Sequence, residues 1–210
     1  MKLIRLGILA GVIATFLLTI ALYPSLPDIV ASHWNASGVA DGYMPKFWDF
    51  IIIPLIMTAC VGLFALLPRI DPKKKNYEKF RNYYEGFILI LVLFLLAIQV
   101  QMILWNIGYL ISPNLTFPIL FGILFIAIGF LVEHSEPNWF AGIRTPWTMT
   151  SERVWKTTNV RGGKLFKLAG VISFFGVLAG NYALWFVLAP VLIVTVYTVI
   201  YSYLEYRNEV

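Results

Sequence analysis

Two short clusters combine a histidine with carboxylates, a set of side chains that can ligate a cation. They are Asp28, His33 and Asp41 in one cluster, and Glu133, His134 and Glu136 in the other. Neither spacing matches a metal-binding motif. We therefore expect no metal and no cofactor. The first cluster should hold a hydrogen-bonded histidine and the second should present solvated charges.

The motifs of the common enzyme classes are missing from the sequence. It has no Gly-x-Ser-x-Gly, no His-Glu-x-x-His and no phosphate-binding loop. Its single cysteine, Cys60, lies in an apolar run and has no partner for an intrachain disulfide. No ionisable residue lies in the middle of an apolar segment, which counts against a proton-coupled transporter and an intramembrane protease. We predict that the protein is not an enzyme.

The elements that must position any functional residue are membrane helices. Of the 210 residues, 60% are hydrophobic and only 13% charged, and the mean hydropathy is +0.79. A soluble domain carries roughly 25% charged residues. Six apolar segments approach the ~20 residues that cross a bilayer as a helix. They lie at about 6–23, 50–67, 87–105, 117–132, 166–182 and 184–203. The predicted fold is an all-α polytopic bundle of six transmembrane helices.

The basic residues give these helices a direction. Of the 16 Lys and Arg residues, all but Lys46 fall before the first segment, between the second and third, between the fourth and fifth, or after the sixth. The positive-inside rule places those regions, and both termini, on the cytoplasmic side of the cell membrane. The first segment follows Lys2 and Arg5 but lacks a small-x-small cleavage site, so we expect it to remain as a span.

Each predicted half of the chain carries one long loop. Residues 1–112 form a three-helix half whose outer loop, 24–49, lies between the first two spans. Residues 113–210 form the second half, whose inner loop, 133–165, lies between spans four and five. The outer loop is rich in Asn, Ser and Gly turn residues and has aromatic ends, so we expect a compact, structured cap.

The inner loop is too rich in tryptophan and basic residues to be a simple linker. Thr150 or Ser151 can cap a short helix over 151–159, which Gly162-Gly163 would end. Trp147, which precedes that helix, and Val154 and Trp155 within it are expected to face the bilayer. Two interpretations stay open: an interfacial helix that anchors the loop, and a surface that docks another protein.

Gln99 and Gln101 are the most polar side chains within the apolar segments. Residues two apart point to nearly opposite faces of a helix, so the pair cannot act together. We expect two separate interhelical hydrogen bonds, each worth about 0.6–2 kcal/mol.

Both loops contain motifs of a known family. Residues 27–43 read Pro-x5-His-Trp-Asn-x-x-Gly-x-x-Asp-Gly-Tyr. Residues 138–164 contain Asn-Trp-Phe-x-Gly-Ile-Arg-Thr-Pro-Trp-Thr, then Glu-x-Val-Trp-x-x-Thr-Asn, then Gly-Gly-Lys. In this order, and over most of its length, the chain resembles the SdpI family.

The resemblance implies an integral membrane protein of the immunity type. It implies protection against a membrane-active toxin peptide outside and sequestration of a small repressor protein inside, with membrane lipids as further partners and no direct binding of nucleic acid. The alternative is a membrane transporter or an enzyme that acts on a lipid or a small solute.

The candidate site residues lie in the two loops. The outer set, expected to bind the ligand, consists of His33, Trp34, Asn35, Gly38, Asp41 and Tyr43. The inner set, expected to bind the soluble partner, consists of Asn138, Trp139, Gly142, Arg144, Thr145, Pro146, Trp147, Trp155, Asn159 and Gly163.

The predicted topology can be tested with single cysteines at positions 37 and 76 in a Cys60→Ser background. An impermeant thiol reagent should label position 37 in intact cells, and position 76 only after the membrane is opened. Labelling of position 76 from outside, or of position 37 only from inside, would contradict the six-span model.

Overall fold

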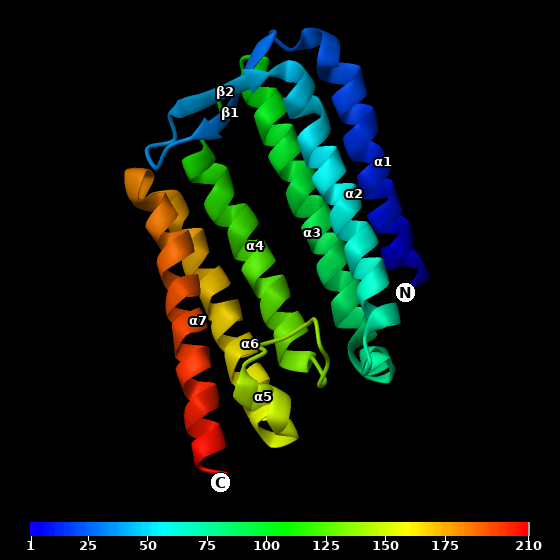
Figure 1. Ribbon diagram of the computed structural model, residues 1–210. Coiled ribbons are helices and arrows are strands. Elements are labelled where there is room, and N and C mark those ends of the chain that lie inside the picture. The colour runs from blue at the N-terminus through cyan, green and yellow to red at the C-terminus, as the bar shows by residue number, and fades with distance from the viewer. Residues whose placement is uncertain (210) are drawn as a thin grey trace.

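Lipid cannot satisfy exposed backbone groups, so an apolar chain must pair them within helices. The computed structural model describes residues 1–209; Val210, the last residue of the predicted second half, lies outside the described residues. Figure 1 shows long helices running side by side, with a two-stranded hairpin across one end. The long helices are α1 (Lys2–Leu22), α2 (Lys46–Ile70), α3 (Tyr77–Asn106), α4 (Pro113–His134), α6 (Glu152–Phe174) and α7 (Ala183–Arg207).

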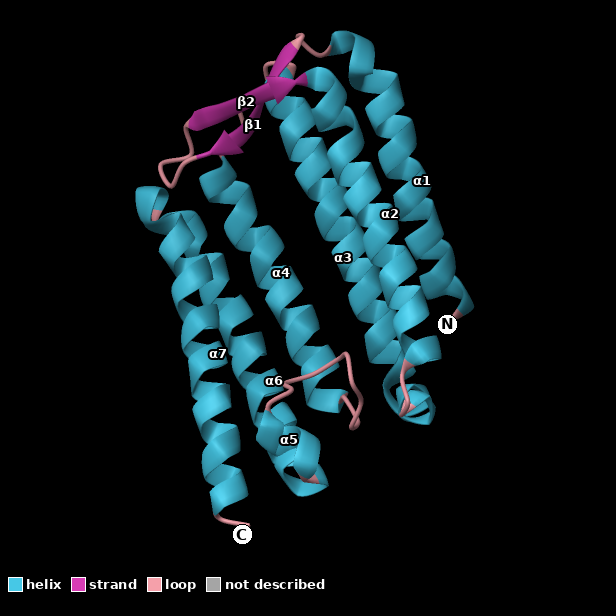
Figure 2. Cartoon of the chain, viewed as in Figure 1, coloured by secondary structure: helices cyan, strands magenta, loops and turns pink. Residues whose placement is uncertain are grey.

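Shorter elements connect these helices. The strands are β1 (Ile29–Trp34) and β2 (Ala40–Pro45), the one short α-helix is α5 (Pro146–Thr150), and the 3-10 turns are η1 (Tyr23–Ser25), η2 (Lys74–Asn76), η3 (Phe175–Leu178) and η4 (Gly180–Tyr182). Figure 2 shows that both strands lie at one end of the bundle. The predicted all-α class is therefore correct for the bundle, but the sequence analysis missed this hairpin.

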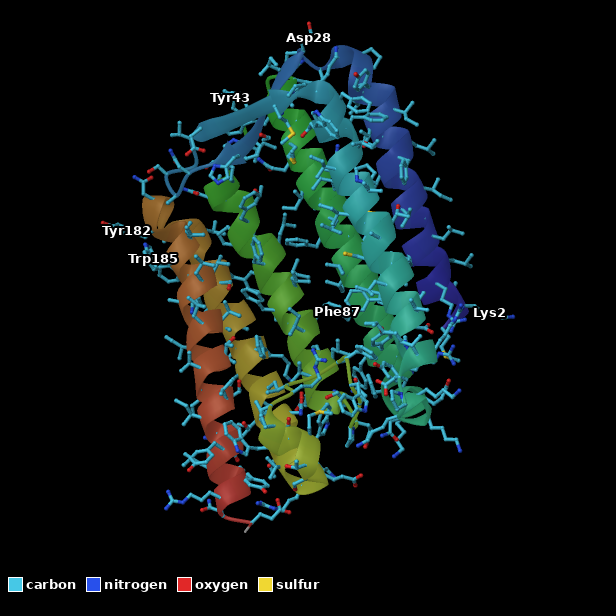
Figure 3. The ribbon with its side chains drawn as sticks, in the orientation of Figure 1. Lys2, Asp28, Tyr43, Phe87, Tyr182 and Trp185 are labelled. Carbon is cyan, nitrogen blue, oxygen red and sulfur yellow. The ribbon has the colours of Figure 1, made fainter. Side chains whose placement is uncertain are left out.

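Five segments are long and apolar enough to cross a membrane. They are Lys2–Ser25, Lys46–Ile70, Lys74–Asn106, Pro113–His134 and Gly180–Arg207. Helix α6 is not among them, because its first half carries the polar inner motif. Six spans thus remain a prediction. Both chain ends lie at the end of the bundle opposite the hairpin (Figure 1), and Figure 3 shows Lys2 far from the hairpin residues Asp28 and Tyr43.

Helix α6 does not end where the sequence predicted. The proposed short helix over 151–159 continues through Gly162-Gly163 as a single helix of 23 residues. The two glycines serve packing instead of termination. A Cβ on Gly163 would lie 2.6 Å from the carbonyl oxygen of Gly129 on α4, and one on Gly162 would lie 3.1 Å from Cγ2 of Thr198 on α7. Any side chain at either position would meet a neighbouring helix.

The contact between α4 and α6 also depends on a second pair of glycines, Gly122 and Gly170, each seven residues from the corresponding glycine of the first pair. A Cβ on Gly122 would lie 2.8 Å from the carbonyl oxygen of Gly170. Small residues let two helix backbones approach closely, and this contact replaces the hydrophobic drive that lipid removes. The glycine seam (Gly122 and Gly129 on α4, Gly163 and Gly170 on α6) therefore holds the polar helix against an apolar one.

The outer loop forms an antiparallel hairpin in which Ile29 pairs with Pro45 and Trp34 with Ala40. The sequence analysis expected a compact cap over these residues and did not reveal the strands or their register. The side chain of Asn106, at the end of α3, fixes the hairpin to the bundle. Its Oδ1 accepts a hydrogen bond from the backbone N–H of Ala31 at 2.7 Å, and its Nδ2 donates to the carbonyl of Ala31 at 3.0 Å.

The two glutamines of α3 behave differently from expectation. Gln101 donates to the carbonyl of Ile111 at 2.5 Å, within the connection that leads to α4. Gln99 is fully buried, and neither its Oε1 nor its Nε2 has a hydrogen-bond partner among residues 1–209. The prediction of an interhelical bond for each glutamine is wrong, because one bond is local to the helix end and the other is not made.

Adding one methyl group to the glycine seam should destabilise the protein. Gly163→Ala must push α6 away from the backbone of α4, so we expect the free energy of unfolding to fall by about 1–3 kcal/mol. Thermal unfolding in detergent micelles measures this. Gly86→Ala is the matched control, because a Cβ there meets nothing within 4 Å, and it should leave stability equal or higher. Equal losses in both variants would show that the seam does not limit helix packing.

Candidate functional site

The inner loop, residues 135–151 as the structure defines it, folds around the fully buried side chain of Asn138. The Oδ1 of Asn138 accepts hydrogen bonds from the backbone N–H groups of Phe140, at 2.8 Å, and Ala141, at 2.6 Å. Its Nδ2 donates to the carbonyls of Glu136, at 2.8 Å, and Ala141, at 2.7 Å. One carboxamide thus pairs with four backbone groups of a tight turn, groups that would be costly to bury alone.

The connection between α2 and α3 holds the same turn from its other side. Asp71 is buried, and its Oδ2 accepts a hydrogen bond from the backbone N–H of Trp139 at 2.9 Å. The hydroxyl of Tyr77 lies 3.2 Å from that carboxylate oxygen and 3.2 Å from Oδ1 of Asn138. The first half of the chain therefore helps to shape the motif that the second half carries.

Asn159 forms hydrogen bonds with the backbone of the residues that follow the turn, as Asn138 does with the turn itself. Its Oδ1 accepts from the backbone N–H of Ile143 at 2.7 Å, and its Nδ2 donates to the carbonyls of Ile143, at 3.3 Å, and Trp155, at 3.0 Å. Gly142 passes directly over it with φ of +108°, and a Cβ there would lie 2.8 Å from Oδ1 of Asn159. Both the backbone conformation and the lack of space require glycine at this position.

Trp155 and Val154 point into the protein. Trp155 is 1% exposed, and its indole N–H donates to the carbonyl of Ser135 at 2.9 Å. Val154 is completely buried. The prediction that these two residues face the bilayer is wrong, because the indole finds its hydrogen-bond partner inside the loop and its ring fills the space beneath it.

Side-chain caps fix the starts of α5 and α6. Oγ1 of Thr145 accepts from the backbone N–H of Thr148 at 3.2 Å, while Oγ1 of Thr148 accepts from the backbone N–H of Thr145 at 2.8 Å. Ser151 caps α6 by accepting from the N–H of Val154 at 3.2 Å, which confirms one of the two predicted caps. Oγ1 of Thr145 also donates to Oγ of Ser202 at 3.0 Å and so ties α5 to α7.

The inner set of candidate residues divides into two groups. The members whose side chains or backbone lie within the loop scaffold are Asn138, Gly142, Thr145, Trp155, Asn159 and Gly163. The members that reach the surface, which we call the inner face, are Trp139, Arg144, Pro146 and Trp147.

Trp139 is 51% exposed, and the exposed Arg144 donates to its carbonyl oxygen through Nη1. Trp147 is half-buried, with its ring 5.1 Å from that of Tyr203 on α7. The inner face thus consists of the exposed indole of Trp139, the guanidinium of Arg144, Pro146, and the indole of Trp147, which packs against Tyr203.

The outer set is arranged along the hairpin. Nδ1 of His33 is 2.6 Å from Oδ1 of Asp41 on the opposite strand, which agrees with the expected hydrogen-bonded histidine. Asn35 shapes the hairpin tip by accepting from the backbone N–H groups of Ser37, at 2.9 Å, and Val39, at 3.2 Å. Tyr43 is 62% exposed, and its hydroxyl donates to the carbonyl of Ala40 at 3.4 Å.

Three members of the outer set line a pocket of about 210 Å³ beneath the hairpin tip. His33, Trp34 and Asn35 form its upper wall, and its deeper walls come from α4 and the start of α7, including Phe121 and Val187. The ring of Trp34 packs edge-on against Trp105 at 5.5 Å between centroids. The pocket is apolar inside and polar at its mouth, which suits an apolar side chain of a peptide.

Sequence reasoning missed the residues that join the loops to the rest of the bundle. Asp71 and Tyr77 support the inner loop, and so does Asn76, whose Nδ2 donates to the carbonyl of Pro137 at 2.7 Å. On the other side, Nδ2 of Asn114 contacts the carbonyls of Ala36, at 3.2 Å, and Gly180, at 3.1 Å. The sequence contains a feature that could have revealed them, because each is an Asp, Asn or Tyr at the edge of an apolar segment. Within residues 1–209, no group of three or more His, Cys, Asp or Glu residues could hold a metal ion.

Comparison with known proteins matches two regions of the chain, one in each half, to known families. Residues 10–58, which include the whole hairpin, match a family described as a domain of unknown function (DUF1648). Residues 135–202, which include the inner loop, match the SdpI/YfhL protein family. The Immunity protein SdpI of Bacillus subtilis (strain 168) is 29% identical over 198 residues, covering 92% of this chain and 91% of that protein. No solved structure matches the chain.

Removing the Asn138 carboxamide should open the inner loop. Asn138→Ala leaves buried backbone groups without partners, each costing about 1–3 kcal/mol. We expect faster cleavage of the loop by protease and greater quenching of tryptophan fluorescence by acrylamide, measured on protein in micelles. Asn82→Ala, at an exposed position on α3, is the matched control and should behave as wild type. Unchanged cleavage and quenching in the Asn138 variant would mean that the loop does not depend on this side chain.

Proposed function

We propose that this chain, which belongs to the SdpI/YfhL protein family, protects its membrane against a membrane-active toxin peptide. The carrying observation is that the similarity to an immunity protein extends over 92% of the chain and so includes both loops. A multi-pass membrane protein of the immunity type needs no catalytic group. It needs a surface that recognises the toxin before the toxin disrupts the bilayer.

In this proposal the outer pocket takes an apolar side chain of the peptide. Burial of one large apolar side chain contributes about 1.5–3 kcal/mol. At the pocket mouth, His33 and Asn35 offer hydrogen bonds to the backbone of a bound peptide, and the hydrogen bond to Asp41 fixes the orientation of the imidazole. Recognition thus combines an apolar anchor with polar groups that set its direction.

The orientation of the bundle completes this scheme. We propose that α6 crosses the membrane with the other five long helices, so that the hairpin faces outward and both termini face the cytoplasm. The single Lys46 at the hairpin end and the many basic residues at the other end support this orientation. The hairpin would then be the first part of the protein that a secreted peptide meets.

We further propose that the inner face holds a small soluble repressor when the toxin peptide is bound. Trp139, Arg144, Pro146 and Trp147 are the candidate contacts, and the buried residues of the inner set act by positioning them. The connection is physical: Asn114 at the start of α4 contacts the hairpin tip, and α4 ends at the inner loop. Such a relay requires that the peptide bind one helix arrangement better than another.

Filling the outer pocket should abolish protection. Leu184→Trp places a large side chain at the pocket wall, and His33→Ala removes a polar group at its mouth. We expect cells that express either variant to lose at least tenfold in the peptide concentration that they tolerate, a change equivalent to about 1.4 kcal/mol. Ser37→Ala, on the exposed hairpin tip, is the matched control. Full protection in both pocket variants, at equal membrane abundance, would place the toxin site elsewhere.

A substitution in the inner face should reduce recruitment of the repressor without reducing protection against the toxin peptide. Arg144→Ala removes the exposed guanidinium, so we expect toxin-dependent recruitment of a tagged candidate repressor to the membrane fraction to fall several-fold while peptide tolerance persists. The repressor to test is one encoded beside this gene. Lys164→Ala removes an exposed charge from α6 and should leave recruitment unchanged. Equal recruitment by Arg144→Ala and wild type would contradict the assignment of the inner face.

A further inference from the structure

A groove of about 760 Å³ lies at the end of the bundle opposite the hairpin. It is bounded by the start of α1, the end of α2, the η2 turn and the start of α3. Its floor is apolar and includes Val61, Phe64 and Ile88, while its rim carries Arg69, Lys74 and Lys75. The groove lies outside the two sets of candidate residues described above, although Tyr77, which supports the inner loop, is part of its lining.

The buried carboxylate of Glu85 forms ion pairs with two of the arginines that line this groove. Its Oε1 accepts from Nη2 of Arg5 at 2.6 Å and from Nε of Arg81 at 3.0 Å. Arg81 is also paired with Glu78 at 3.0 Å. These guanidinium groups are therefore neutralised by the protein itself, and the pairing of Arg5 with Glu85 connects α1 to α3.

The rim cations have no such compensation. Arg69, Lys74 and Lys75 are exposed, and none of them forms an ion pair with a carboxylate within residues 1–209. Three positive charges therefore face one opening above an apolar floor. An anionic group would gain from all three, since each cation near a membrane surface favours anionic lipid.

One polar atom inside the groove also lacks a partner. The second carboxylate oxygen of Glu85, Oε2, is buried and accepts no hydrogen bond from the described residues. Glu85 is only 7% exposed. An acceptor this deeply buried is costly to leave without a donor, and a ligand hydroxyl is one group that could supply it.

These features together select one ligand class. We infer that the groove binds an anionic phospholipid with a hydroxylated headgroup, of the phosphatidylglycerol type. Its phosphate lies at Arg69, Lys74 and Lys75, a headgroup hydroxyl donates to Oε2 of Glu85, and an acyl chain lies along the apolar floor. A soluble phosphate compound would leave the floor uncovered, and a zwitterionic lipid would bring a further cation to a cationic rim.

Lipid titrations followed by native mass spectrometry test this inference. Phosphatidylglycerol, phosphatidic acid and phosphatidylcholine with identical acyl chains are added to the full-length protein in micelles. We expect phosphatidylglycerol to bind at least tenfold more tightly than phosphatidylcholine. Phosphatidic acid, which lacks the headgroup hydroxyls, should bind with intermediate affinity. Glycerol phosphate added in excess should not displace the lipid, which separates a membrane lipid from a free phosphate.

Two sets of variants locate the site. The triple variant Arg69→Gln, Lys74→Gln, Lys75→Gln should lower the affinity for phosphatidylglycerol at least tenfold. The matched triple variant Lys156→Gln, Lys164→Gln, Arg207→Gln removes the same charge from exposed residues elsewhere on the chain and should lower it less than twofold. Ala65→Trp narrows the groove without changing its charge and should also weaken binding, with a thermal unfolding profile like that of the wild type in lipid-free micelles.

Several outcomes would overturn the proposal. Equal losses in the two triple variants would show diffuse attraction to a basic surface. Equal binding of phosphatidylcholine and phosphatidylglycerol would show a site without charge selection. Unchanged binding in a folded Ala65→Trp variant would place the lipid outside the groove.

Discussion

The backbone of a turn packed between helices must find hydrogen-bond partners, and this constraint governs the inner end of the molecule. Asn138 and Asn159 meet it with two carboxamides that reach both donors and acceptors of the chain around them. An asparagine is suited to this because its short side chain offers one acceptor and one donor group together. Gly142 then passes over Asn159 without steric conflict, and the indole N–H of Trp155 donates a hydrogen bond to the carbonyl of Ser135 at the start of the loop. The residues that define the family motif in this chain are largely those that hold the loop in shape.

This arrangement changes the meaning of a motif rich in tryptophan and arginine. Such composition favours a binding surface or a membrane anchor when only the sequence is considered. In the folded protein six of the ten candidate residues of the inner set lie within the loop scaffold, whereas Trp139, Arg144, Pro146 and Trp147 reach the surface. A loss of function on replacing Asn138 or Trp155 would therefore report on loop geometry, while replacement of Arg144 or Trp139 would report on contact. The distinction decides how any set of mutations in this loop should be interpreted.

Helix α6 joins the inner loop to the bundle by an unusual route. It begins as a polar helix at the inner loop and continues beside α4, where the glycine seam brings the two backbones together. Close backbone contact between small residues stabilises helix pairs in lipid, where apolar side chains gain little from mutual burial. Glu133 on α4 and Lys167 on α6 add an ion pair near one end of the seam. The helix is thus held by its neighbours and not by its own hydropathy, because its first half carries the polar inner motif.

The sequence by itself determined the membrane class and the positions of five of the long apolar helices, because hydrophobic length is a local property. It placed the fifth segment at 166–182, whereas α6 runs from Glu152 to Phe174. It also gave Ser151 as one of two candidate caps and His33 as a hydrogen-bonded histidine. Only the tertiary structure decided that Gly162-Gly163 lie inside a helix, that Trp155 is buried, and that the outer loop is a hairpin. Each of these depends on a neighbour distant in the chain: Gly129 for the seam, Ser135 for the indole, and Asn106 for the strand edge. Glycine ends a helix or packs one, and tryptophan faces lipid or fills a core, according to what lies opposite, and that information is not contained in local sequence.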